Sequence, residues 1–199
     1  MNTLERSGGV SAIRRSFNSI SDDRRIQVVI LAWLFGSFIE GASGFGTPAA
    51  VAAPLMVAMG FPAAGAVMLG MMIQSTPVTF GAVGTPVLVG VQEGVASPEF
   101  LAMLTESGVA MDQYVNAVAV RAALIHGITG TLMPTLMVIM MTRFFGANRS
   151  WTEGLSILPF TLFGGIAFTV PYVLTAWILG PEFPSLVGGL VGLAIVSFT

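Results

Sequence analysis

Charge is scarce in this chain. Only 9% of its 199 residues are Asp, Glu, Lys or Arg, whereas 54% are hydrophobic. Soluble domains carry about 25% charged residues, so this chain cannot cover a folded core with a water-exposed surface. Helices satisfy their own backbone hydrogen bonds in lipid. The sequence therefore predicts an all-α integral membrane protein, a multi-span helical bundle, and it argues against a soluble enzyme or binding module.

Cysteine is absent, and histidine occurs once, at His126. The first absence excludes disulfides, thiolate chemistry and cysteine-based metal sites, and a single histidine argues against a histidine-cluster metal site. No Ser/His/acid arrangement indicates an enzyme, and no basic aromatic patch indicates binding to nucleic acid. We therefore expect no catalytic residues, no metal, no cofactor and no nucleic-acid partner.

The few arginines predict an orientation in the membrane. Five of them precede the first apolar run, two lie in residues 143–149, and none lies in residues 92–112, which carry four carboxylates. The positive-inside rule places residues 1–25, a basic segment, and residues 143–154 in the cytoplasm, and the acidic loop 92–112 outside. Residues 26–199 then form a single transmembrane domain.

An unusual polar stretch, FIEGASGFGTP at residues 38–48, interrupts the first apolar region. Glu40 is the only carboxylate between Asp23 and Glu93. Three glycines loosen the backbone and Pro48 removes a donor, so we expect a helix that stops and restarts near Pro48. The apolar run 26–39 would be about 21 Å long, too short for a ~30 Å hydrocarbon core. We therefore predict that residues 26–60 form a re-entrant hairpin. The alternatives are one long broken helix or two short tilted spans.

A second polar stretch, QSTPVTFGAVGTP at residues 74–86, repeats this chemistry, and Gly46-Thr47-Pro48 recurs as Gly84-Thr85-Pro86. We interpret residues 61–91 as a broken span. Paired interruptions of apolar segments are the best sequence indication of a transporter site.

Three further apolar segments follow, a span at 113–142, a span at 155–179 and an incomplete span at 185–199. The last one remains apolar to its final residue, although a membrane helix needs about 20 residues. We therefore expect the chain to be a fragment of a longer transporter, whose remaining helices and the lipid bilayer are its partners.

Helix ends freed at membrane depth survive only inside protein or beside a water-filled cavity. The helix that begins near Thr47 carries partial positive charge at its start, which suits a small carboxylate. The predicted substrate- or ion-binding residues are Glu40, Gly41, Ser43, Gly44, Gly46, Thr47, Ser75, Thr76, Thr79, Gly81, Gly84, Thr85 and Arg121. The alternative for the small and hydroxyl residues among them is simple helix packing.

Three ionisable residues have two interpretations each. Glu40 is either a carrier of the transported proton or a structural acid that caps freed donors or reaches an interface. Arg121 either pairs with an anionic substrate or with Glu40, or extends to the outer face. His126 is either a packed, hydrogen-bonded side chain or a proton relay, and it does not share a helix face closely with Arg121.

The two stretches together resemble the L-lactate permease family. Residues 38–48 match the family's pattern of Phe, Ile or Leu, Glu, Gly, two small residues, Gly, Phe, Gly, Ala or Thr, and Pro. Residues 77–86 match its second pattern; the family's Asn-Thr-Ala stands here as Gln74-Ser75-Thr76. The basic segment before the first span, Arg121 and Gly180-Pro181-Glu182 with Pro184 are also similar, and the resemblance covers essentially the whole chain.

The resemblance implies secondary active uptake of a short 2-hydroxy monocarboxylate, L-lactate or glycolate, with H⁺ across the bacterial inner membrane. It also implies that residues 40–47 and 76–85 line the site. The alternatives to this function are an ion channel and a non-transporting membrane component.

Overall fold

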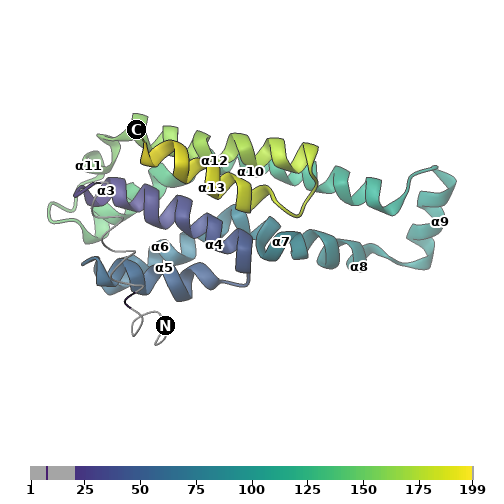
Figure 1. Cartoon of the computed structure of the whole chain (residues 1–199), viewed down its shortest axis with the longest axis horizontal. Helices are drawn as coiled ribbons and strands as arrows, with labels where there is room; N and C mark the ends of the chain where they lie inside the picture. Colours follow the sequence, from purple (N-terminus) through teal and green to yellow (C-terminus); the bar gives the residue numbers. More distant parts are fainter. Residues whose placement is uncertain (1–7, 9–20, 199) are drawn as a thin grey trace.

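The computed structural model describes residue 8 and residues 21–198. Most of the predicted basic segment 1–25 therefore lies outside the described residues. The described part is all helical and forms an elongated bundle whose long helices run roughly parallel to its longest axis (Figure 1).

The first helix is continuous from residue 24 to residue 43. It comprises α3 (Arg24–Gln27), the π-helical η1 (Val28–Phe35) and α4 (Gly36–Ser43). Asp23 caps its start by accepting a hydrogen bond from the backbone N–H of Arg25. Its 20 residues span about 30 Å, so the helix is longer than the 14-residue apolar run predicted. Our expectation that this segment is too short to cross the bilayer is therefore wrong, because Arg24, Arg25, Gln27 and the polar residues after Ile39 also join the helix.

The chain then turns back. After Gly44–Gly46, α5 (Thr47–Ala58) returns alongside the first helix toward the end where α3 begins (Figure 1). The Arg24 guanidinium donates a hydrogen bond to the Gly60 carbonyl, which joins the two ends of this pair. The 12 residues of α5 cover only about 18 Å, so α5 cannot cross the bilayer alone. Residues 24–60 thus have the geometry of a hairpin with one long and one short arm.

The next segment is an interrupted helix that runs in one overall direction (Figure 1). It contains α6 (Ala63–Met72), the 3₁₀ turns η2 (Ile73–Ser75) and η3 (Pro77–Phe80), α7 (Gly81–Thr85), the π-helical η4 (Pro86–Val91) and α8 (Gln92–Val95). The helical path is broken at Thr76 and again within α7, where three residues have left-handed dihedral angles.

Five helices complete the described fold. They are α9 (Pro98–Glu106), α10 (Met111–Phe145), α11 (Trp151–Leu155), α12 (Leu158–Ile178) and α13 (Pro184–Ser197). The short α9 lies across the far end of the bundle, and α12 and α13 pack against each other beside α10 (Figure 1). Serine side chains cap two starts, Ser97 for α9 and Ser150 for α11.

Four helical segments are long and apolar enough to cross a membrane: Arg24–Ser43, Pro77–Val95, Met111–Phe145 and Leu158–Ile178. Large apolar side chains cover the outer faces of α10 and α12, among them Ile125, Ile128, Leu132, Ile166, Val170 and Trp177. An apolar surface of this extent is incompatible with water. The prediction of a helical, multi-pass integral membrane protein is confirmed.

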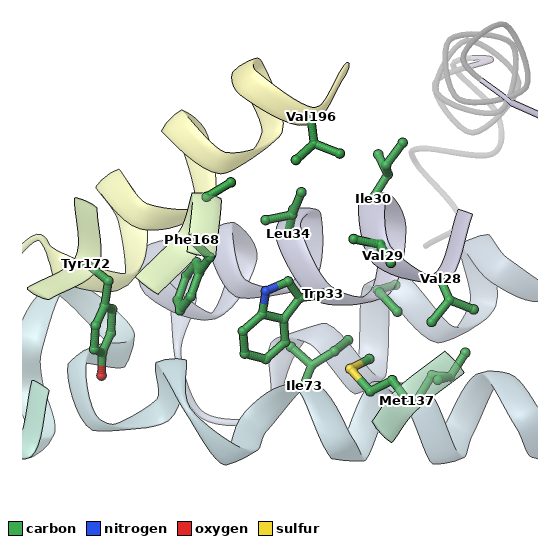
Figure 2. Close-up of a cluster of buried hydrophobic side chains, with 14 of the residues drawn as sticks. Val28, Val29, Ile30, Trp33, Leu34, Ile73, Met137, Phe168, Tyr172 and Val196 are labelled. Carbon is green, nitrogen blue, oxygen red and sulfur yellow. The ribbon is translucent and has the colours of Figure 1, made fainter. Parts of the chain in front are cut away.

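The first helix lies at the centre of the core. Residues Val28 to Leu34 are all buried, and Figure 2 shows Trp33 pointing between Phe168 of α12 and Ile73. The rings of Trp33 and Phe168 meet edge to face with centroids 5.0 Å apart. Small residues allow neighbouring helices to approach closely; a Cβ added at Gly36 would lie 2.6 Å from the Ile73 side chain. The first hairpin arm is therefore held on several sides by the rest of the chain.

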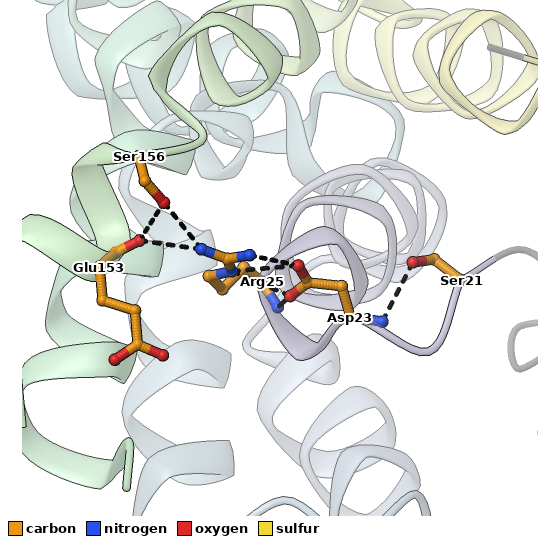
Figure 3. Close-up of polar contacts among 5 residues, drawn as sticks. All are labelled: Ser21, Asp23, Arg25, Glu153 and Ser156. Atoms are coloured by element: carbon orange, nitrogen blue, oxygen red, sulfur yellow. Dashed lines mark hydrogen bonds and ion pairs between the residues drawn. The ribbon is translucent and has the colours of Figure 1, made fainter. Parts of the chain in front are cut away.

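Arg25 fastens the base of this hairpin to the segment between α10 and α12 (Figure 3). Its guanidinium forms an ion pair with Asp23, 2.6 Å between Nη2 and Oδ2, and donates hydrogen bonds to the Glu153 carbonyl (3.1 Å) and the Ser156 hydroxyl (2.8 Å). The hydrogen bonds from Arg25 hold the pKa of the Asp23 carboxyl below its usual value.

Candidate solute-binding site

The first interruption is built from three successive residues with positive φ, Gly44 (63°), Phe45 (51°) and Gly46 (80°). α5 starts directly after them, with Pro48 in its first turn. The Thr47 hydroxyl donates a 2.7 Å hydrogen bond to the Gly44 carbonyl, three residues back. The backbone N–H groups of Thr47 and Ala49 bond to the carbonyls of Gly44 and Gly46, so the start of α5 is a tightly closed turn.

The second interruption has a similar local structure. Ala82 (45°), Val83 (54°) and Gly84 (78°) have successive positive φ values, and Thr85 and Pro86 follow. The Thr85 hydroxyl donates a 2.6 Å hydrogen bond to the Ala82 carbonyl, again three residues back. The Gly-Thr-Pro repeat in the sequence therefore corresponds to two turns that share three positive φ values and a threonine hydrogen bond, although Gly44 (ψ −161°) and Ala82 (ψ 50°) differ in ψ.

This conformation is strained. Among the described residues, only four other than glycine have positive φ, and three of them, Phe45, Ala82 and Val83, lie in these two interruptions. Each such residue costs about 1–2 kcal/mol, most clearly the β-branched Val83. Strain of this kind clusters at functional sites, where the surrounding structure maintains it.

The same substitution at two valines tests this strain. In the full-length protein, Val83→Gly should raise the free energy of unfolding by about 1 kcal/mol, because glycine adopts positive φ at little cost. Val89→Gly lies in the ordinary right-handed part of η4 and should lower it by about 0.3–0.5 kcal/mol. Both valines are exposed, so lost packing is similar. Apparent melting temperatures in detergent that shift in the same direction would contradict the assignment of strain to Val83.

The two interruptions lie directly against each other. A Cβ added at Gly44 would lie 2.7 Å from both the backbone N and the Cβ of Ala82. A Cβ added at Gly81 would lie 3.0 Å from Glu40 Oε1 and 3.3 Å from the Gly44 Cα, and Gly46 faces the Gln74 amide. Stretches some 40 residues apart in the sequence thus form one unit, with Glu40 at their junction.

Glu40 is completely buried, with 0% exposure. Neither of its carboxyl oxygens makes a hydrogen bond within the described part of the chain, although the Gly46 amide interacts with this carboxyl at a geometry short of one. Ser37 Oγ and Trp33 Nε1, three and seven residues earlier on the same helix, are also buried without a hydrogen-bond partner among the described residues. A negative charge at this position is costly unless a proton or a cation accompanies it.

Side chains from α10, α12 and α13 complete the second interruption. The Tyr172 hydroxyl donates to the Thr76 carbonyl (3.2 Å), and the Ser185 hydroxyl donates to the Pro77 carbonyl (2.7 Å). His126 Nδ1 lies 3.3 Å from both the Thr79 hydroxyl and the Tyr172 hydroxyl. Sequence reasoning missed Tyr172 and Ser185, because no local pattern indicates contacts across 96 and 108 residues.

The predicted site residues separate into groups. Glu40, Gly44, Gly46 and Gly81 meet at the junction, and Thr76 and Thr79 contact Tyr172 and His126. Ser43 and Ser75 are exposed beside it. The Thr47 and Thr85 hydroxyls are engaged as donors inside their own turns. Gly41 packs on the backbone of Ser185 and Leu186, and Gly84 packs on that of Pro181 and Glu182. These two glycines therefore contact the segment 181–186.

Arg121 does not reach this junction through any contact in the described structure. It is exposed, and its guanidinium donates to the Ala117 carbonyl in its own helix. The only ion pair among the described residues joins Arg25 and Asp23. A role of Arg121 toward the substrate or Glu40 stays a prediction.

The fold and the paired interruptions define a class of protein, a multi-pass helical membrane protein with discontinuous helices around a buried acid. Within this class, residues 2–199 match the model of the L-lactate permease family. The chain belongs to the L-lactate permease family, whose members are transporters and not enzymes.

Three relatives illustrate the similarity. A putative L-lactate permease of Haemophilus influenzae is 36% identical, the L-lactate permease of Bacillus subtilis is 31% identical, and the glycolate permease GlcA of Escherichia coli is 33% identical. Each match covers 96% of this chain but only 32%, 30% and 30% of the respective relative. The chain thus spans about a third of the length of these relatives. No solved structure matches it.

Proposed function

We propose that this chain carries the solute site of a secondary active transporter. In this proposal, the complete protein imports L-lactate, glycolate or a similar short 2-hydroxy monocarboxylate across the bacterial inner membrane by proton symport. The observation that carries the proposal is the junction of two similar helix interruptions, each with three successive positive φ values, beside the fully buried Glu40. The names of the relatives supply the substrate class.

The junction provides groups of the kind that such a substrate needs. The hydroxyl groups of Ser43 and Ser75 are exposed beside the interruptions, and α5, whose start carries partial positive charge, begins four residues after Ser43. A proton on Glu40 removes the cost of its buried charge, so the loading of Glu40 and the binding of an anionic solute can be coupled. Glu40 is the proton carrier in this proposal; the structural alternative is a neutral acid that stabilises the turn at Gly46.

The arrangement in the membrane follows from the same features. We place residues 1–25 and 143–154 in the cytoplasm, residues 92–112 outside, and residues 26–60 in a re-entrant hairpin. The contacts of Arg24 with Gly60 and of Arg25 with Glu153 support a common side for these segments. Phe45, at the tip, is 83% exposed beside strained polar backbone. Lipid cannot satisfy such backbone, so the remaining helices of the full-length transporter or a water-filled cavity cover this face.

Counterflow in liposomes tests the proposed function. The full-length protein, loaded internally with unlabelled L-lactate, should accumulate labelled external lactate transiently, and glycolate should compete. An inward proton gradient should drive net uptake that saturates with lactate concentration. An ohmic ion current would instead favour a channel, and absence of lactate flux with intact protein would favour a non-transporting component.

A further inference from the structure

The helical path that leads into the second interruption is already broken at Thr76. Two successive backbone carbonyls at this break, Thr76 O and Pro77 O, have side-chain partners from other helices. Tyr172 of α12 donates to the first and Ser185 of α13 donates to the second. Both side chains are fully buried. A buried carbonyl without a partner is costly, so these two hydroxyls stabilise the broken form of the helix at this point.

The Thr76 carbonyl determines the direction of the hydrogen bonds around Tyr172 and, through them, the tautomer of His126. A carbonyl oxygen can only accept, so the single hydroxyl hydrogen of Tyr172 is directed to Thr76 O. The 3.3 Å contact between the Tyr172 hydroxyl and His126 Nδ1 then requires that Nδ1 carries a hydrogen and donates it. The Thr79 hydroxyl, 3.3 Å from the same nitrogen, is a second acceptor within the interruption.

The Tyr172 ring is fixed as firmly as its hydroxyl. It packs edge to face on Phe80, with ring centroids 5.3 Å apart, and beside Phe168 at 5.2 Å. Phe80 is the last residue of η3, directly before Gly81 at the junction with Glu40. Tyr172 therefore contacts residues 76–80, the segment before the turn at Ala82, at both ends, through its hydroxyl at Thr76 and through its ring at Phe80.

We propose that Tyr172, assisted by His126 and Ser185, is a positioning residue that sets the backbone of the second interruption for solute binding. These three side chains form a clamp on residues 76–80. The inference rests on the proposed function, because it assigns the solute to the junction of the interruptions. The clamp acts through the backbone, so its loss weakens solute binding more than it slows the turnover of bound solute.

Tyr172→Phe in the full-length protein tests the clamp, because it removes the hydroxyl and keeps the ring. We expect the KM for lactate to rise about tenfold, the size of one lost buried hydrogen bond, with the maximal rate within about twofold. Tyr114→Phe is the matched control, since that ring packs on Phe100 far along α10 and no described hydrogen bond involves its hydroxyl. An unchanged KM for Tyr172→Phe would overturn the proposal.

The hydrogen on His126 Nδ1 is tested separately. The amide nitrogen of asparagine can replace the Nδ1–H donor of His126, whereas glutamine places its amide farther along the side chain. His126→Asn should therefore keep the KM within about twofold, and His126→Gln should raise it about as much as Tyr172→Phe does. Equal KM values for the two variants would contradict a role of His126 in the clamp.

A labelling experiment keeps the clamp testable without transport. The chain has no cysteine, so the substitution Ser75→Cys gives a single labelling site. Ser75 is exposed and directly precedes Thr76, where the clamp begins. Tyr172→Phe and Ser185→Ala should each change its maleimide labelling rate about threefold or more, because the loosened backbone samples more conformations. Unchanged rates in both variants would overturn the clamp. If the wild type carries no lactate but both variants change the rate, the proposed function fails and the clamp stands.

Discussion

Glu40→Gln in the full-length protein should abolish proton-driven lactate uptake, leaving about 1% of the wild-type rate or less, because lactate would then cross without a compensating proton, at the roughly 3 kcal/mol cost of an intramembrane charge. Glutamine keeps the shape of the side chain but cannot take up or release a proton. Glu40 is fully buried without a hydrogen bond in the described structure, so no group among the described residues is hydrogen-bonded to it and placed to take over its proton. Exchange of labelled for unlabelled lactate should persist, because exchange does not require net proton release.

The measurement is initial uptake into liposomes at several external pH values, together with counterflow. Glu93→Gln is the matched control, since Glu93 is exposed in α8, far from the interruptions, and should leave both assays unchanged. If Glu40→Gln retains wild-type uptake and pH dependence, Glu40 is a structural acid at the hairpin turn and another group carries the proton.

Gly44→Ala should be among the most destabilising small substitutions in the chain. Gly44 has φ 63° and ψ −161°, a region that is essentially restricted to glycine. Its new Cβ would lie 2.7 Å from the Ala82 backbone N, and backbone cannot rotate away. We expect a loss of about 3 kcal/mol or more in the free energy of unfolding from strain and overpacking together, and loss of uptake.

Gly90→Ala provides the matched control. Nothing lies within 4 Å of a Cβ at Gly90, and this residue belongs to the right-handed helix η4. Alanine there should raise the free energy of unfolding by about 0.5–1 kcal/mol. The two variants are compared by their apparent melting temperatures in detergent. Similar values for Gly44→Ala and Gly90→Ala would show that the two interruptions are not closely packed at Gly44. Ala82→Gly should partly restore the Gly44→Ala protein, because it removes the Ala82 Cβ, one of the three contacted atoms.

Local chemistry made part of this site predictable. The two Gly-Thr-Pro triplets predicted two helix interruptions, and both have three successive residues with positive φ followed by a threonine whose hydroxyl bonds three residues back. The length of the first helix was not predictable from its apolar run, because buried Glu40 and Gly41 continue the helix to Ser43. The apolar run indicated where lipid tolerates the chain, whereas protein neighbours determine where the helix ends.

The sequence by itself determined the class of the protein and its two points of interruption. Scarce charge excludes a water-exposed surface, and glycine, threonine and proline act on their own backbone. The class of the protein and the positions of the interruptions therefore do not depend on contacts with distant residues. Only the tertiary structure decided that the interruptions face each other across Glu40, that Tyr172 and Ser185 complete the second one, and that Arg121 lies apart from them. The physical reason is that membrane helices are apolar on nearly every face, so the period of apolar residues does not identify the face that packs inward.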